Sequence, residues 1–111
     1  MKQSQFLKGS LDVAVLAAVR RGETYGYDVL RQLEGAGLRD VGDASVYGTL
    51  RRLEGEALLA SRLAPSTEGP ARRYYAITEA GSVALTAWAA AFTGVADAIY
   101  RLLDHEPGGT S

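Results

Sequence analysis

Residues 43–57 read Asp-Ala-Ser-Val-Tyr-Gly-Thr-Leu-Arg-Arg-Leu-Glu-Gly-Glu-Ala, and this stretch decides how the whole chain is interpreted. Its apolar residues recur at spacings of three and four, which predicts an amphipathic helix whose buried face carries Val46, Leu50, Leu53 and Ala57. The opposite face is predicted to carry hydroxyls, an aromatic ring and two guanidinium groups, from Ser45, Tyr47, Thr49, Arg51 and Arg52. Such a helix suits a DNA major groove, but an ordinary solvated surface helix has the same pattern. The flanking sequence has to distinguish the two interpretations.

Length and charge place limits on the class of protein. A chain of 111 residues with 47% hydrophobic residues is typical of one globular domain with a modest core. Its net charge of −1 argues against a uniformly basic nucleic-acid binder. Basic residues outnumber acidic ones in residues 1–22 and 45–75, whereas acidic residues dominate 76–111. This segregation allows one basic surface on a nearly neutral protein.

Several functional classes are disfavoured by what the sequence contains. Cysteine is absent, which excludes disulfides, thiolate metal sites and cysteine nucleophiles. The single histidine, His105, lies near the chain end between Asp104 and Glu106. A metal site needs more convergent ligands than these, which favours a solvated histidine, and a Ser-His-Asp arrangement has no plausible geometry. No nucleotide-binding motif is present. We also expect no signal segment and no apolar run approaching ~18 residues. The sequence therefore predicts a cytoplasmic protein without enzyme activity, metal, cofactor or membrane contact.

Two helical segments precede the opening stretch. Residues 7–20 form the first, with Leu11 on its apolar stripe. Residues 25–36 form the second, with Thr24 as candidate N-cap and with Gly26 in the first turn, where we expect another backbone to approach closely. The short link 38–42 then leads into the helix at 43–57. Two helices joined in this way, the second with a polar outer face, have the outline of a helix-turn-helix.

The segment after residue 57 has the features of a β-hairpin. Residues 58–64 and 71–77 are predicted strands, and the Pro/Gly-containing residues 65–70 are predicted to form the loop. Tyr75 and Ile77 would share the core face, with Arg72 and Tyr74 on the other. Arg72 and Arg73 would lie near the base of the loop, where arginines bind phosphate or enter a minor groove, and the Tyr74 hydroxyl could contact a phosphate.

From Thr78, a candidate N-cap, to about Leu103 the pattern is that of one long helix. Its large apolar residues recur at spacings of three and four, namely Leu85, Trp88, Phe92, Val95, Ile99 and Leu102. At 1.5 Å per residue this helix is ~37 Å long. That is more than a compact winged helix, meaning the helix-turn-helix together with its β-hairpin, can cover. Burying six such side chains contributes roughly 9–18 kcal/mol per chain, against an association cost on the order of 4–15 kcal/mol. The pattern predicts pairing with a second copy, to which Leu11 adds area.

In this order, four segments resemble the PadR family of transcriptional regulators, in its short form with a single C-terminal helix. The segments are Gly9-Ser-Leu-Asp-Val-Ala-Val-Leu16, Tyr25-Gly-Tyr-Asp-Val29, the helix Val46–Leu59, and Gly69-Pro-Ala-Arg-Arg-Tyr-Tyr-Ala-Ile-Thr-Glu-Ala-Gly81. Two positions depart from the family pattern. Gly48 stands where the family commonly has proline, and Ala57 stands where it commonly has glycine. Gly48 predicts a looser helix start and leaves the placement of Tyr47 open.

The resemblance implies a mainly α (α+β) fold: a winged helix-turn-helix in residues 1–77, a dimerisation helix in 78–104 and a disordered tail in 105–111. It implies a homodimeric repressor that binds a pseudo-palindromic double-stranded operator. Lys8 is then a candidate phosphate contact beside the residues of the helix and the hairpin. Some members of the family bind phenolic or planar aromatic effectors at the dimer interface, and Trp88 stands where a tryptophan can line that cavity. Two alternatives remain: a dimeric interaction module that reads no DNA sequence, and Trp88 as a plain interface residue.

Overall fold

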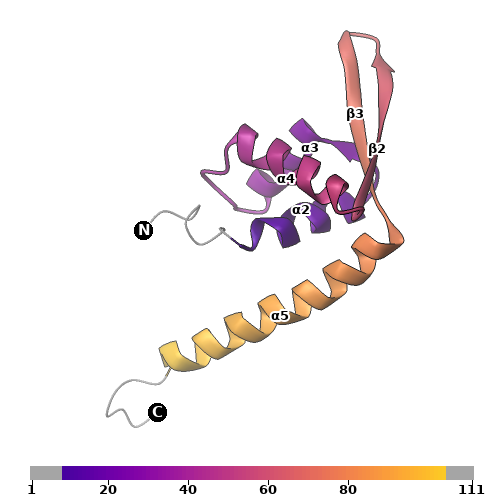
Figure 1. Ribbon diagram of the computed structural model, residues 1–111. Helices are drawn as coiled ribbons and strands as arrows, with labels where there is room; N and C mark the ends of the chain where they lie inside the picture. The colour runs from indigo at the N-terminus through magenta and orange to yellow at the C-terminus, as the bar shows by residue number, and fades with distance from the viewer. Residues whose placement is uncertain (1–8, 105–111) are drawn as a thin grey trace.

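The computed structural model describes residues 9–104 and has an α+β winged-helix architecture (Figure 1), which confirms the predicted fold class. The elements in chain order are α2 (Leu11–Arg20), β1 (Thr24–Tyr25), α3 (Gly26–Gly35), α4 (Asp43–Gly55), β2 (Leu59–Ser66), β3 (Gly69–Ile77) and α5 (Glu79–Asp104). The predicted first helix starts later than expected, because Gly9 and Ser10 form a turn and Gly9 has a φ of 94°. Residues 7, 8 and 105–111 lie outside the described range.

Helix α2 is central to the core because it contacts α3, α4, α5 and β3. Its Val15 and Leu16 are completely buried. Three of the four apolar residues predicted for the buried face of α4, Val46, Leu50 and Leu53, are also completely buried. The fourth prediction, Ala57, is wrong, since α4 ends at Gly55 and Ala57 is exposed with a φ of 63°. The core therefore holds one face of α4 and leaves its opposite face outward.

A short strand, β1, was not predicted. Residues 25–36 were expected to be helical with Thr24 as N-cap, but α3 begins at Gly26 and Thr24 pairs with Tyr75 of β3. The buried Thr24 hydroxyl donates a hydrogen bond of 2.6 Å to Asp28 instead of capping the helix. This bond and a second one from Gln32 lower the pKa of Asp28 below its usual value. β1 becomes one outer strand of the antiparallel sheet β1-β3-β2, with β2 at the other edge.

The hairpin of β2 and β3 is longer than predicted, and only Thr67 and Glu68 form its turn. Pro65 lies within β2, which is possible because β2 is an edge strand and its pairing with β3 shifts register there. Arg72 and Arg73 pair with Ala64 and Leu63, so they lie along the arm of the hairpin and not at the base of a loop. In Figure 1 this hairpin projects well away from the three-helix body, as a wing does.

Helix α5 starts against the core and then runs along one side of it (Figure 1). The Thr78 hydroxyl accepts a hydrogen bond of 3.0 Å from the Gly81 N–H, which confirms Thr78 as N-cap. Contrary to expectation, α5 is long and apolar enough to cross a membrane by length and composition alone, with a mean hydropathy of 1.4 over 18 residues. Only 6% of that window is buried within the chain. The same apolar surface fits a helix that packs on another protein surface.

Candidate nucleic-acid interface

The outward face of α4 carries fewer side chains than the sequence suggested. Ser45, Tyr47, Arg51 and Arg52 are exposed, as predicted. Thr49 is only 7% exposed, so its predicted place on the outer face is wrong. The reason is helical geometry: Thr49 lies three residues after Val46 and four before Leu53, which puts it on their buried face. Of the five predicted side chains, the exposed surface of α4 therefore offers one hydroxyl, one phenol and two guanidinium groups.

Tyr47 is held by helix α3. Its ring packs so closely on the buried Gly26 that a Cβ at Gly26 would lie 2.1 Å from the ring carbon Cε1. Gly26 thus admits an aromatic ring where the sequence analysis expected a backbone. The tyrosine is 38% exposed, so its other side remains open to solvent. Gly48 does not loosen the helix start, because α4 begins five residues earlier at Asp43.

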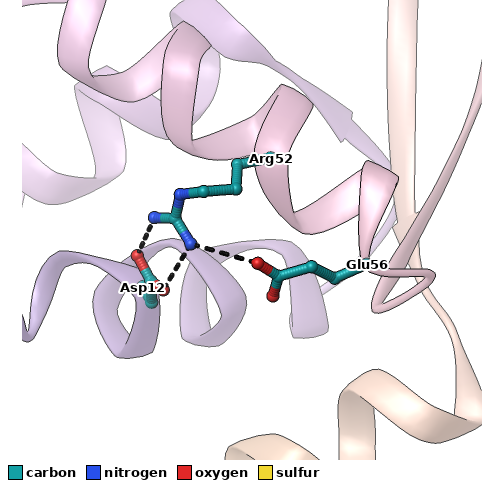
Figure 2. A network of polar contacts seen from close by, with 3 residues as sticks. All are labelled: Asp12, Arg52 and Glu56. Atoms are coloured by element: carbon teal, nitrogen blue, oxygen red, sulfur yellow. Dashed lines mark hydrogen bonds and ion pairs between the residues drawn. The ribbon is translucent and has the colours of Figure 1, made fainter.

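Arg51 and Arg52 have different surroundings. Arg52 donates two hydrogen bonds, of 2.9 and 2.5 Å, to the two carboxylate oxygens of Asp12 on α2, and its guanidinium lies 3.6 Å from Glu56 (Figure 2). The hydrogen bonds to Asp12 raise the pKa of Arg52 further above its already high value. Arg51 is exposed and forms no ion pair with any residue between 9 and 104. Arg51 is therefore the guanidinium of α4 that is open to a phosphate or a base.

The two arginines of β3 point to opposite faces of the wing. Successive residues of a strand alternate between faces, so Arg73 lies on the same side as the buried Tyr75. The Arg73 guanidinium donates to the Ser61 hydroxyl at 2.9 Å, and Ser61 donates to Glu54 of α4 at 2.5 Å. Burial raises the pKa of the Tyr75 phenol beside them. Arg73 is thus connected to α4 through one serine.

Arg72 and Tyr74 lie on the far face, in a layer of cations and rings that sequence reasoning did not foresee. The Arg72 guanidinium lies 4.5 Å from the Tyr25 ring centre, and the rings of Tyr25 and Tyr74 meet edge to face at 5.5 Å. Arg62 lies 5.4 Å from the Tyr74 ring and is held by two hydrogen bonds to Glu23. Nothing in the sequence indicated β1, and Tyr25 comes to lie beside Tyr74 only because β1 pairs with β3, whereas Arg62 pairs with Tyr74 within the hairpin.

A mainly apolar groove of about 740 Å³ runs between the start of α2 and the middle of α5. It is lined by Trp88, Phe92, Val95 and Ile99, all predicted to face a partner, and by Asp12 and Val13 of α2. Phe92, Val95, Ile99 and Leu102 are 50–74% exposed, although Leu102 lies outside the groove. Trp88, in contrast, is half-buried and packs against the core of its own chain.

One residue predicted for the dimer interface belongs elsewhere. Leu85 is only 3% exposed because it packs into the core of its own chain, so its assignment to the interface is wrong. Leu11 is half-buried against the same core and lines a separate hollow between α2 and α4, so its place in the interface stays a prediction. The candidate phosphate contact Lys8 lies outside the described residues. Among residues 9–104, no cluster of three potential ligands could hold a metal ion.

Comparison with known proteins decides the family. The model of the PadR-like family of transcriptional regulators matches residues 15–87. The chain belongs to this family. Its members are DNA-binding transcriptional regulators and not enzymes.

Solved PadR-like regulators share both the fold and the length of the chain. One from Bacillus cereus is 33% identical, with a TM-score of 0.81, and the match covers 92% of this chain and 99% of that one. A PadR-family regulator from Eggerthella lenta is 28% identical, with a TM-score of 0.80 and coverages of 92% and 88%. A PadR-like factor from Bacteroides fragilis is also 28% identical, with a TM-score of 0.73 and coverages of 89% and 95%. Because each match covers at least 89% of this chain, it extends beyond residue 87 and includes most of α5.

Proposed function

We propose that this protein is a cytoplasmic, homodimeric repressor that binds a pseudo-palindromic operator and is released from it by a small phenolic or planar aromatic effector. The observation that carries the DNA-binding part is the position of Arg51, exposed and without an ion pair to residues 9–104 on the outer face of α4. Arg73 lies on the side of the wing that is hydrogen-bonded to α4. The two guanidiniums can therefore approach one duplex together, with Ser45 and Tyr47 of α4 reaching base edges or phosphates.

The exposed side of α5 supports dimerisation. Phe92, Val95, Ile99 and Leu102 would leave a contiguous apolar strip in water if the chain were alone, and such strips mark interaction surfaces. A second copy covers them most simply, because two identical helices pair around a two-fold axis. A symmetric dimer presents two α4 helices, which suits half-sites about one DNA turn apart, ~34 Å.

The groove beside Trp88 supports an effector site. Its volume of about 740 Å³ falls within the ~300–1,000 Å³ range typical of small-molecule sites. Its walls are mostly apolar, and the Trp88 ring offers a face on which a planar aromatic compound can stack. If Trp88 serves only as an interface residue, its fluorescence will not change when compounds that release DNA are added at saturation.

Fluorescence anisotropy with a promoter fragment from the protein's own locus tests the proposal. We expect tight binding to this fragment and weak binding to random DNA of equal length. Arg51→Ala should weaken binding and reduce the salt slope by about one unit for each phosphate that the variant no longer neutralises. Arg31→Ala is the matched control, since Arg31 is an exposed arginine on α3 beside Tyr27. Equal affinity for promoter and random fragments would count against an operator-binding repressor.

A second candidate function, a dimeric interaction module that reads no DNA sequence, is favoured by the net charge of −1 and the acidic residues after 76. It predicts intact dimers whose DNA binding is weak and indifferent to sequence. The anisotropy experiment separates the two candidates because only the repressor discriminates between fragments.

A further inference from the structure

The ion pair between Asp12 and Arg52 connects two elements that are far apart in sequence (Figure 2). Asp12 lies in the first turn of α2, and Arg52 lies in the last turn of α4. Each of the two terminal guanidinium nitrogens donates to a different carboxylate oxygen, at 2.9 and 2.5 Å. A two-bond arrangement of this kind fixes direction as well as distance, because the planar guanidinium and the carboxylate must lie nearly in one plane.

Stability alone does not explain this pair. The Arg52 side chain is 50% exposed and the Asp12 side chain 24% exposed, and ion pairs in contact with solvent contribute little to the free energy of unfolding. The pair does bridge a poorly filled part of the fold. A hollow of about 450 Å³ lies between α2, the link before α4, and α4 itself, and Asp12 and Arg52 both line it. Side-chain packing therefore leaves the angle between α2 and α4 incompletely fixed on this side.

We propose that Asp12 is a positioning residue for DNA binding, which holds Arg52 and thereby fixes the C-terminal half of α4 relative to α2 without contacting DNA. Arg52 is then a structural clamp and not a phosphate contact, in contrast to its assignment from the sequence. Arg51 is the preceding residue on the helix, so a rotation of α4 that breaks the clamp also displaces the exposed guanidinium. The proposal rests on DNA binding through α4 and not on the proposed effector.

The experiment compares Asp12→Asn, Arg52→Gln and the double variant with the unmodified protein. The DNA probe is a duplex selected from a random pool by the unmodified protein, so the position of the natural operator does not enter. We expect each single variant to weaken binding of this duplex by about 3- to 30-fold, a typical range for coupled residues. The double variant should be no weaker than either single one. Binding of random DNA and the salt slope should stay unchanged, because the number of neutralised phosphates is the same.

Two controls separate positioning from general damage to the fold. Glu23→Gln breaks the other exposed two-bond pair, between Glu23 and Arg62, whose side chains are 38% and 58% exposed and which lies away from α4. This variant should bind the selected duplex like the unmodified protein. The charge-reversed variant Asp12→Arg with Arg52→Asp should recover part of the affinity. Thermal unfolding of every variant sets a temperature at which all of them are folded.

Three results would overturn the proposal. A salt slope that falls in Arg52→Gln while Asp12→Asn binds normally would make Arg52 a phosphate contact. Tighter binding by Asp12→Asn would mean that Asp12 competes with DNA for Arg52. Unchanged binding by both single variants would mean that the clamp has no role in DNA binding. If the unmodified protein selects no duplex from the pool, operator binding itself fails, which is a different outcome from all three.

Discussion

Replacing Ala57 with glycine should stabilise the protein, because Ala57 occupies a backbone conformation that disfavours a side chain. Its φ is 63°, in the left-handed region. The helix end explains why: the Leu58 N–H bonds to the Leu53 carbonyl at 2.9 Å, and the Ala57 N–H bonds to the Glu54 carbonyl at 2.9 Å. These two bonds define a Schellman motif, in which glycine is the usual residue at the left-handed position.

The expected magnitude follows from two opposing contributions. Removing a side chain from the left-handed region relieves about 1–2 kcal/mol. Glycine also increases the conformational entropy of the unfolded chain, which costs about 0.4–1 kcal/mol. The net gain for Ala57→Gly is therefore about 0.5–1 kcal/mol. For a domain of this size such a gain raises the melting temperature by roughly 2–6 °C.

Urea unfolding followed by circular dichroism, together with thermal melts, measures this effect at fixed protein concentration. The chain contains a matched control at the end of α3. There Gly37 has a φ of 104°, and Leu38 and Gly37 make the same two bonds to Leu33 and Glu34. Gly37→Ala should destabilise the protein by a similar amount to that gained by Ala57→Gly. A loss of stability in Ala57→Gly would refute the assignment of strain at this helix end.

Four further outcomes follow from the same geometry. Gly48→Ala should add about 0.5–1 kcal/mol of stability, because no atom outside the neighbouring backbone of α4 lies within 4 Å of the new Cβ, and DNA affinity should not change; a destabilised variant would contradict this. Phe92→Glu should give monomers by light scattering, since it puts a charge on the exposed strip of α5, and a persisting dimer would exclude the proposed interface. Leu85→Ala should cost about 2–5 kcal/mol in urea unfolding, since Leu85 is a core residue, and a change in dimerisation alone would contradict this. Burial raises the pKa of the Tyr75 phenol above its ordinary value of 10.0. The contribution of this shift to the free energy of unfolding is therefore present below pH 10 and is lost as pH rises through the higher folded-state pKa. In urea unfolding between pH 9 and 11, Tyr75→Phe should lose less stability than the unmodified protein, and equal losses would exclude this role of Tyr75.

Helices whose apolar residues recur at regular spacing could be predicted from the sequence. The spacing of Val46, Leu50 and Leu53 located α4 to within two residues of its end, because three large apolar side chains on one face leave little choice of orientation. The wrong placement of Thr49 also follows from this periodicity. The buried face of α4 packs against several elements and is wide enough to include Thr49, the polar residue between Val46 and Leu53. Periodicity identifies the centre of a buried face but not its width.

Features that depend on pairing between distant segments could not be predicted. β1 consists of Thr24 and Tyr25 only, too short for any period, and it exists because β3 offers an open edge. The hydrogen bond between Arg73 and Ser61 and the clamp between Asp12 and Arg52 likewise depend on contacts across 12–40 residues. These contacts decide which arginines are open to DNA. The sequence therefore indicated which arginines are candidates for DNA contact, but not which of them are held by other side chains.

The junction between α4 and α5 suggests how the dimer would control the spacing of the two α4 helices on DNA. Thr78 joins the start of α5 to the residues that directly follow α4: its hydroxyl donates to the Ala57 carbonyl at 2.8 Å, and its N–H donates to the Leu58 carbonyl at 3.1 Å. Gly81 then packs so closely on Leu58 that a Cβ would lie 2.1 Å from the Leu58 carbonyl oxygen. Leu85 completes the attachment inside the core, and it is the last residue of α5 that is buried. The end of α4 is therefore fixed to the helix that would carry the partner, so in the proposed dimer a rotation of one α5 against the other must change the separation of the two α4 helices.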